Sequence, residues 1–176
     1  MGPRTQTRIL AGVLAHLQRF RKAMDRVRER GGELRPGDIH RDRRFLLDLE
    51  EHWYVPAIER AGTWDGVRDL IDLFDRNGLV QVVASDYVAS HKLKALGLSG
   101  RFHRAYAGEE LGFLKPSSEL FHHIVRDLGV PADRVLHLGD RPETDGVAAS
   151  GAGCRVHIFD SGFSSPRELL KDLTGG

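Results

Sequence analysis

The most constraining feature of this sequence is a short apolar segment that runs into a turn rich in carboxylates. Val135–Leu138 is followed by Gly139-Asp140-Arg141-Pro142 and then by a run of small residues that ends at Gly153. An apolar run bounded by turn residues is typical of a buried strand, and Pro142 suits the first position of a helix. A strand that turns directly into a helix is the unit from which parallel α/β sheets are built.

Two carboxylates, Asp140 and Asp145, follow this predicted strand. The carboxyl ends of strands form the edge at which open α/β sheets bind ligands. Paired hard oxygens at such an edge suit Mg²⁺, which takes one or two carboxylates and leaves its other positions to water and phosphate. The same residues are also explained without a ligand, with Asp140 in an Asx-turn and Asp145 in the first helical turn. This stretch alone leaves both interpretations open.

Two further stretches add polar groups of a complementary kind. Val82–Asp86 belongs to an apolar strand, predicted from Leu79, that ends in the hydroxyl of Ser85. Gly112–Phe121 brings Lys115 to the start of a helix that is predicted over Pro116–Leu128. A hydroxyl donor, a fixed ammonium and a carboxylate pair are the groups needed to hold a phosphoryl group beside Mg²⁺. The three stretches together therefore favour a phosphate site.

In this order the stretches resemble the motifs of the haloacid dehalogenase-like (HAD) superfamily, whose members are mostly Mg²⁺-dependent phosphatases. Ser85 matches the second motif, Lys115 with Pro116 and Phe121 matches the third, and Gly139-Asp140 with Asp145 matches the fourth. The resemblance covers roughly residues 62–160. It implies an α/β fold with a doubly wound parallel (Rossmann-like, HAD-type) sheet and an N-terminal helical cap.

The resemblance also implies a role for each residue of the expected site. Ser85 and Lys115 would be its catalytic residues, and together with Asp86 they would form its phosphate-binding part. Lys115 would neutralise the charges of nucleophile and phosphate, and Ser85 would hydrogen-bond the phosphoryl oxygens. Asp140 and Asp145 would form the metal-binding part, with Asp140 ligating Mg²⁺ and Asp145 supporting it.

The first motif of the family is not recognisable in this sequence. In the family it is an apolar strand ending in Asp-x-Asp, which supplies the covalent nucleophile and the general acid/base. The chain contains no Asp-x-Asp, and residues 1–24 contain no Asp or Glu. Ile9–Leu14 would fit a degenerate copy with Ile9 and Ala11 in place of the carboxylates. The polar residues 4–8 before it favour a helix instead.

Two functions therefore stay open. The first is a phosphatase that acts on a small phosphorylated metabolite with Mg²⁺ and receives its Asp-x-Asp from an upstream segment or a partner chain. The second is a catalytically inactive HAD-like module, a pseudophosphatase, that binds a phosphorylated ligand or a protein. An in-frame strand ending in Asp-x-Asp upstream of Met1 would decide for the enzyme.

The rest of the chain divides into two predicted parts. Helical patterns over about residues 6–30 and 41–60 predict a cap-like segment at residues 1–61. Alternating strands and helices predict an α/β core at residues 62–176 whose first strand is missing. In the family that strand lies between the strands ending at Ser85 and Asp140. We therefore expect those two strands to pair directly, or their exposed edges to favour a homodimer.

The composition, with 40% apolar and 29% charged residues, is that of an ordinary globular protein. No apolar run approaches the roughly 20 residues that span a bilayer, and no signal core is present. We therefore predict a cytoplasmic protein without a membrane partner. Residues 1–44 carry twelve Lys/Arg against five Asp/Glu. A solvated helix face is the usual explanation, and steering of an anionic substrate toward a site beneath a basic cap is the alternative. No nucleic-acid-binding motif accompanies this excess, which argues against a nucleic-acid partner.

Overall fold

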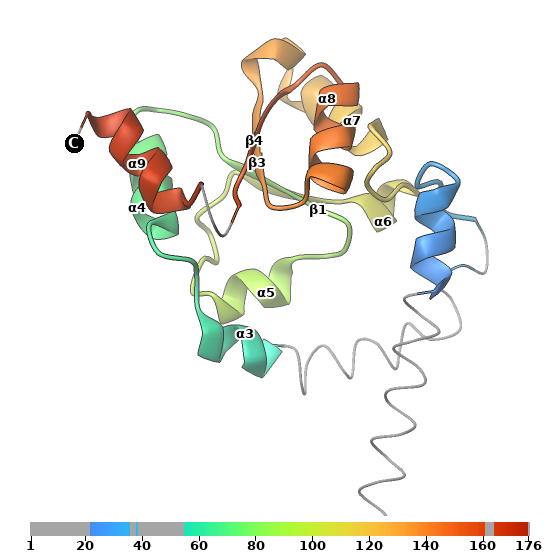
Figure 1. The fold of residues 1–176 in the computed structure, drawn as a ribbon, viewed down its shortest axis with the longest axis horizontal. Helices are drawn as coiled ribbons and strands as arrows, with labels where there is room; N and C mark the ends of the chain where they lie inside the picture. Colours follow the sequence, from blue (N-terminus) through green and yellow to red (C-terminus); the bar gives the residue numbers. More distant parts are fainter. Residues whose placement is uncertain (1–21, 36–37, 39–54, 161–163, 176) are drawn as a thin grey trace, which may run out of the picture.

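A computed structural model describes residues 22–35, 38, 55–160 and 164–175 of the 176-residue chain. Its centre consists of two pairs of parallel strands with helices packed around them (Figure 1). The first pair is β1 (Val82–Ser85) with β2 (Arg104–Ala107), and the second is β3 (Leu136–Gly139) with β4 (Arg155–Ile158). Parallel strands alternating with helices confirm the predicted α/β fold class.

The helices that surround the strands in the described part of the chain are α3 (Val55–Ala61), α4 (Val67–Arg76), α5 (Ser90–Ala95), α6 (Gly108–Leu111), α7 (Glu119–Leu128), α8 (Val147–Gly151) and α9 (Pro166–Thr174). Two shorter helical turns, η2 (Ala132–Arg134) and η3 (Pro142–Gly146), precede and follow β3. Residues 22–29 are also helical. Pro142 begins η3, as its missing backbone N–H and fixed φ predict.

The main core lies where α7 and α8 cover the strands. Its buried members are apolar or aromatic side chains, namely Tyr106, Leu120, Phe121, Ile124, Ala148, Ala149 and Cys154. The small residues Ala148 and Ala149 of α8 are fully buried in this core. A second, smaller cluster joins Met24 and Val27 of the helix at residues 22–29 to Leu114.

Several predicted elements begin later than the sequence pattern indicates. The strand expected from Leu79 begins at Val82. Leu79 and Val80 are 55% and 65% exposed, so their apolar character does not reflect burial. The helix expected from Pro116 begins at Glu119. Residues 6–21 and 39–54, which include Ile9–Leu14 and parts of both predicted cap helices, lie outside the described residues.

The prediction that β1 and β3 pair directly is wrong. Among the described residues β1 pairs only with β2, and β3 pairs only with β4, so two separate two-stranded sheets result. The boundary between a cap at residues 1–61 and a core at 62–176 stays a prediction. No helix in the described part of the chain is long and apolar enough to cross a membrane.

Candidate functional site

Lys115 lies at the centre of the predicted site, in the loop between α6 and α7. Its side chain is buried, and its Nζ donates hydrogen bonds to Asp145 Oδ1 at 2.6 Å and to the carbonyl oxygen of Ala84 at 3.4 Å. Ala84 belongs to β1, whereas Asp145 lies in η3, directly after β3. One ammonium group therefore joins the carboxyl ends of the two strand pairs, which share no backbone ladder in the described part of the chain.

Asp145 is a buried carboxylate with partners on both of its oxygens. Besides the bond from Lys115, its Oδ2 accepts the backbone N–H of Arg141 at 3.3 Å, and His137 Nε2 lies 3.6 Å from Oδ1. Burial raises the pKa of Asp145, but His137 and Lys115 outweigh burial and hold this pKa far below its usual range. Asp145 is therefore ionised at neutral pH.

Gly139 gives Asp145 the space it occupies. A Cβ atom at Gly139 would lie 2.8 Å from the Cβ atom of Asp145 and 3.0 Å from Nε2 of His137. Real Cβ atoms do not approach so closely, so a larger residue would displace the carboxylate. Gly139 thus lets the backbone at the end of β3 lie close to Asp145, and the next residue, Asp140, adds a carboxylate.

Ser85 and Asp86 form the end of β1 and the start of the following turn. Ser85 Oγ accepts the backbone N–H of Tyr87 at 3.3 Å. Asp86 is 9% exposed, and its Oδ1 accepts the backbone N–H of Lys115 at 2.8 Å. Two hydrogen bonds therefore connect the end of β1 to Lys115. The Asp86 side chain binds the backbone N–H of Lys115, and the Ala84 carbonyl binds its ammonium group.

Asp140 follows β3 and is exposed, unlike Asp145. Of the two predicted metal ligands, only Asp140 thus has a carboxylate open to a cation from solvent, since both oxygens of Asp145 have protein partners. No group of three or more His, Cys, Asp or Glu in the described residues is arranged to hold a metal ion. These hard oxygens suit Mg²⁺, but the described residues supply only part of a ligand set.

Three polar residues of this region are not predicted from the sequence. His137 lies in β3 two residues before Gly139, so the period of two along a strand could have placed it near the site. Arg28 and Arg141 both lie near Tyr87. Burial, with Asp86 and Glu109 nearby, raises the pKa of Tyr87 to about 12, while Arg28 and Arg141 act in the opposite direction. Arg28 is one of several basic residues in its part of the sequence, and no local pattern distinguishes it from the others.

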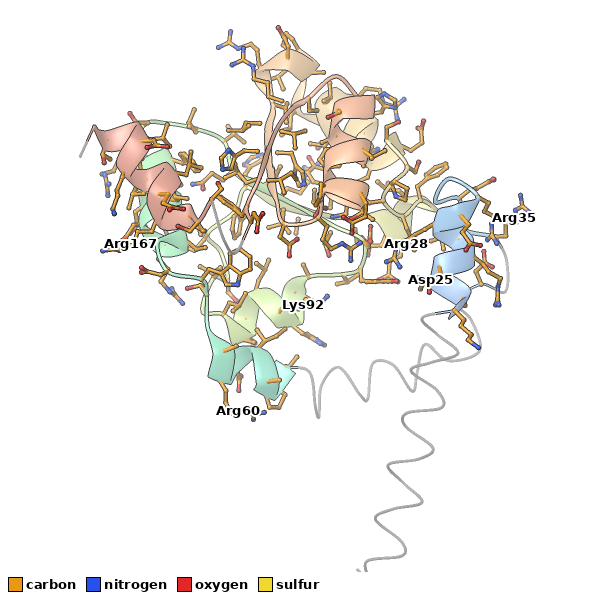
Figure 2. The ribbon with its side chains drawn as sticks, viewed as in Figure 1. Asp25, Arg28, Arg35, Arg60, Lys92 and Arg167 are labelled. Atoms are coloured by element: carbon orange, nitrogen blue, oxygen red, sulfur yellow. The ribbon has the colours of Figure 1, made fainter. Side chains whose placement is uncertain are left out.

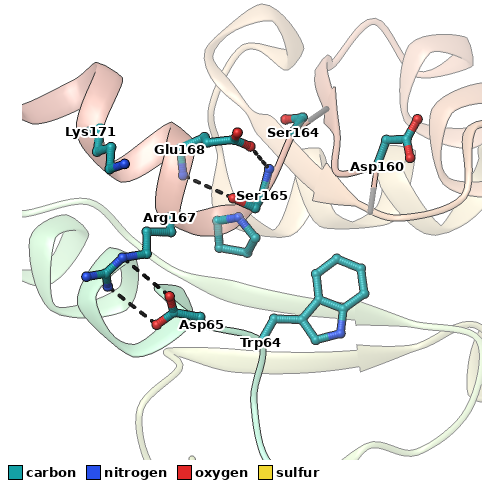
Figure 3. A pocket seen from close by; sticks show the side chains of 9 residues that line it. Trp64, Asp65, Asp160, Ser164, Ser165, Arg167, Glu168 and Lys171 are labelled. Carbon is teal, nitrogen blue, oxygen red and sulfur yellow. Dashed lines mark hydrogen bonds and ion pairs between the residues drawn. The ribbon is translucent and has the colours of Figure 1, made fainter. Parts of the chain in front are cut away.

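A surface hollow of about 490 Å³ lies outside this constellation, beside the start of α9 (Figure 3). Trp64 and Asp65 form one wall, and Arg167 contributes to the other through an ion pair with Asp65 at 3.3 Å. Ser165 and Glu168 complete a reciprocal cap of α9 there. The residues that line this hollow include none of the five predicted site residues.

Comparison with known proteins gives a family and a set of relatives. The family model described as haloacid dehalogenase-like hydrolase matches residues 4–153. The chain is 29% identical over 133 residues to a phosphoglycolate phosphatase of Rhodospirillum rubrum, over 74% of this chain and 52% of that protein. It is 32% identical over 90 residues to a phosphoglycolate phosphatase of Neisseria gonorrhoeae, over 51% and 38%.

A third relative is a glyceraldehyde 3-phosphate phosphatase of Methanopyrus kandleri, 37% identical over 62 residues, which are 35% of this chain and 27% of that protein. The chain thus spans from about a quarter to about half of the length of these relatives. Among solved structures, a HAD phosphatase from Thermococcus onnurineus has a TM-score of 0.61 at 18% identity, over 76% of this chain and 70% of that chain. A β-phosphoglucomutase from Clostridium difficile has a TM-score of 0.56 at 18% identity, over 65% and 52%. These two likenesses show the fold.

Proposed function

The chain belongs to the haloacid dehalogenase-like hydrolase family, and on this premise we propose that it carries a phosphatase-type site for small phosphorylated metabolites that works with Mg²⁺. The observation that carries the proposal is the position of the Lys115 ammonium, which contacts the end of β1 and the carboxylate that follows β3. The second, third and fourth motifs thereby meet at one group. The names of the three curated relatives, all phosphatases, support this activity.

In the proposed site Lys115 supplies the positive charge that a phosphoryl group needs. Asp145 keeps this ammonium in place through a bond of 2.6 Å, so its role is to position Lys115. The hydroxyl of Ser85, at the end of β1, would donate a hydrogen bond to a phosphoryl oxygen. The carboxylate of Asp86 would repel a phosphate at close range, so it would not bind the phosphate directly. Asp86 would instead contribute by holding the backbone of Lys115 in place.

Mg²⁺ is the proposed cofactor, and Asp140 is its proposed ligand among the described residues. A bound Mg²⁺ would neutralise phosphate charge and polarise the phosphorus. Asp145 would support Asp140 from the same turn. Because the described residues supply only part of a ligand set, we expect weak binding by this chain.

A second candidate function rests on a feature of the sequence. Covalent phosphoryl transfer needs a nucleophile, and the Asp-x-Asp that supplies it in this family does not occur in the chain. A module that binds phosphorylated ligands without hydrolysing them would keep Lys115 and Ser85 and need no such carboxylate. Phosphate binding is common to both candidates, whereas turnover distinguishes them.

The test measures phosphate binding and turnover separately. Calorimetric titration with inorganic phosphate is expected to show binding that Mg²⁺ strengthens. Lys115→Gln should weaken this binding by about tenfold or more, since it removes the ammonium. Asp140→Asn should remove only the strengthening by Mg²⁺ and should leave phosphate binding without Mg²⁺ unchanged. Lys94→Gln, at an exposed position of α5, is the control and should bind like the unmodified chain.

Hydrolysis of p-nitrophenyl phosphate with Mg²⁺ is measured on the same proteins. We expect turnover at or near background from this chain alone, because it lacks the Asp-x-Asp nucleophile of the family and because Asp86, the carboxylate next to Ser85, already accepts the backbone N–H of Lys115. Equal phosphate affinity in the unmodified chain and in Lys115→Gln would overturn the proposed site. Strong Mg²⁺-dependent turnover that Ser85→Ala abolishes would show that Ser85 is a nucleophile and would overturn its proposed role as a hydrogen-bond donor.

A further inference from the structure

The imidazole of His137 is buried beside the charged pair of the proposed site. Its side chain is 11% exposed, and that of Asp145 is 7% exposed. Other charged side chains, such as those of Arg60 and Arg167, lie at the surface of the molecule (Figure 2). A buried polar group without a hydrogen-bond partner is uncommon in proteins and often has a functional reason. His137 is such a group.

Packing fixes the position of the His137 ring. His137 lies in β3, and its ring meets the ring of Phe121 in α7 edge-on, with the two centroids 4.7 Å apart and the planes at 68°. A Cβ atom at Gly139 would lie 3.0 Å from Nε2 of His137. Gly139 therefore leaves free the space that Nε2 needs, and the ring keeps one orientation relative to the end of β3.

In this orientation Nε2 of His137 faces Asp145 without binding it. The atom lies 3.6 Å from Asp145 Oδ1, which is just beyond hydrogen-bond distance. It is buried and has no hydrogen-bond partner among the described residues. A buried polar atom in this situation is costly. A shortening of the distance by roughly 0.7 Å would give an ordinary N–H···O bond to Oδ1.

The same oxygen, Asp145 Oδ1, already accepts the bond from Lys115 at 2.6 Å. Lys115 has one positive charge, which the buried carboxylate and a phosphoryl group would have to share. A phosphate that draws the ammonium toward itself weakens the bond to Asp145, and a buried carboxylate that loses its partner is costly. A second donor at Oδ1 would reduce this cost, and His137 Nε2 is the atom in place to supply it.

We propose that His137 is a positioning residue of the site. As Lys115 turns toward a phosphoryl oxygen, the Nε2–H group of His137 closes onto Asp145 Oδ1 and compensates the carboxylate. No proton is transferred, because the imidazole stays neutral with its hydrogen on Nε2 and only hydrogen bonds are exchanged. His137 acts through Asp145 and does not touch the phosphate. This inference rests on the proposed function, since it assumes that Lys115 binds the phosphoryl group.

Two substitutions separate the donor of His137 from its ring. His137→Gln keeps an N–H donor near the position of Nε2 and removes the ring, whereas His137→Phe keeps a ring that can contact Phe121 and removes the donor. In calorimetric titrations of the full chain with inorganic phosphate, His137→Phe is expected to bind about tenfold more weakly than the unmodified chain. His137→Gln is expected to keep most of the affinity. The opposite order would show that only the packing of the ring matters and would overturn the inference.

His123→Phe is the matched control. The ring of His123 makes a similar edge-on contact with Tyr106, with centroids 5.9 Å apart, but among the described residues it makes no hydrogen bond to Lys115 or Asp145. This variant should bind phosphate like the unmodified chain. An equal loss of affinity in His123→Phe and His137→Phe would show a general effect of the substitution and would overturn the inference.

Nitrogen-15 NMR of the imidazole rings tests the proposal on the unmodified chain. Nε2 of His137 is expected to carry a hydrogen, and its signal should shift when phosphate is added, while the signals of His123 stay unchanged. A Nε2 atom without hydrogen, or a His137 signal that does not move although phosphate binds, would overturn the inference and leave the proposed function standing. Failure of the unmodified chain to bind phosphate would overturn both proposals, and Lys115→Gln reports on the proposed function alone.

Discussion

Asp145 keeps its negative charge inside the protein because its partners lie in direct contact with it. An ion pair of this kind contributes little net stability, since desolvation offsets most of the attraction between the charges. Removal of one member is far more costly, because it leaves the other charge buried without a partner. The pair of Lys115 with Asp145, at 2.6 Å between Nζ and Oδ1, is therefore sensitive to substitution and to pH.

Asp145→Asn is expected to lower the free energy of unfolding at pH 7 by about 3 kcal/mol, since Lys115 loses its charged partner. The pKa of Asp145 is lower in the folded state than in the unfolded chain. Its ionised form therefore stabilises the fold above the unfolded pKa of about 4, and this contribution is lost as the pH falls below that value. Urea unfolding at pH 7, 5 and 3 measures the effect.

The variant should lose less stability than the unmodified chain between pH 5 and pH 3, so the difference between the two should shrink on acidification. Asp133→Asn, at an exposed position of η2, is the control and should change neither the stability nor its pH dependence. A constant difference between Asp145→Asn and the unmodified chain across this pH range would contradict the prediction.

At the scale of elements, the segment at residues 22–35 and the loop at residues 112–115 behave as one unit. They share an isolated antiparallel bridge between Glu33 and Phe113, besides the two backbone hydrogen bonds at Gly32 and Leu34. Because Lys115 ends this loop, an element from the N-terminal part of the chain helps to position a residue of the proposed site.

Gly32→Ala is expected to undock this unit. Gly32 has φ +85°, and its new Cβ atom would lie 2.0 Å from a backbone oxygen that cannot easily move. We expect a loss of about 2 kcal/mol or more and faster amide exchange at residues 22–35 and 112–115. Gly31→Ala is a matched control, because Gly31 has φ +86° but no atom within 4 Å of the new Cβ. Equal effects of the two substitutions would show that backbone strain alone, and not the close contact, is responsible.

At the scale of the whole molecule, the described residues form two short parallel sheets in place of one continuous sheet. Among the described residues each sheet has only two strands, so each strand has one hydrogen-bonded neighbour. Unpaired strand edges attract further strands. Leu136 in β3 is 50% exposed, which adds an apolar side chain to one of these edges.

We therefore expect the chain to form a homodimer, measurable by light scattering coupled to size-exclusion chromatography over a dilution series. Leu136→Lys should shift the equilibrium toward the monomer, since a charged side chain on an edge strand opposes pairing. Leu173→Lys is the control, because Leu173 is similarly exposed, at 53%, but lies on α9. A monomer at every concentration would contradict this prediction.

The sequence by itself determined the parallel α/β class and the order of the three motifs. Strand and helix periodicities are local properties, and the turn at Gly139-Asp140-Arg141-Pro142 contains its own signals for a strand end and a helix start. For the same reason β1 ends at Ser85, as the sequence predicts. Strand starts were less predictable, since Leu79 and Val80 are apolar without being buried.

Only the tertiary structure decided which strands pair and which charges meet. The bond between Lys115 and Asp145 joins residues 30 positions apart, and no periodicity reports such a contact. The missing first strand led to the prediction that β1 pairs directly with β3, but these two strands do not pair in the structure. Which strands pair depends on where the helices and loops place them. The approach of Arg28 to Asp86 likewise depends on the docking of a separate segment at Gly32. Local sequence patterns specify elements, whereas contacts between distant residues arise from packing, which places the elements relative to one another.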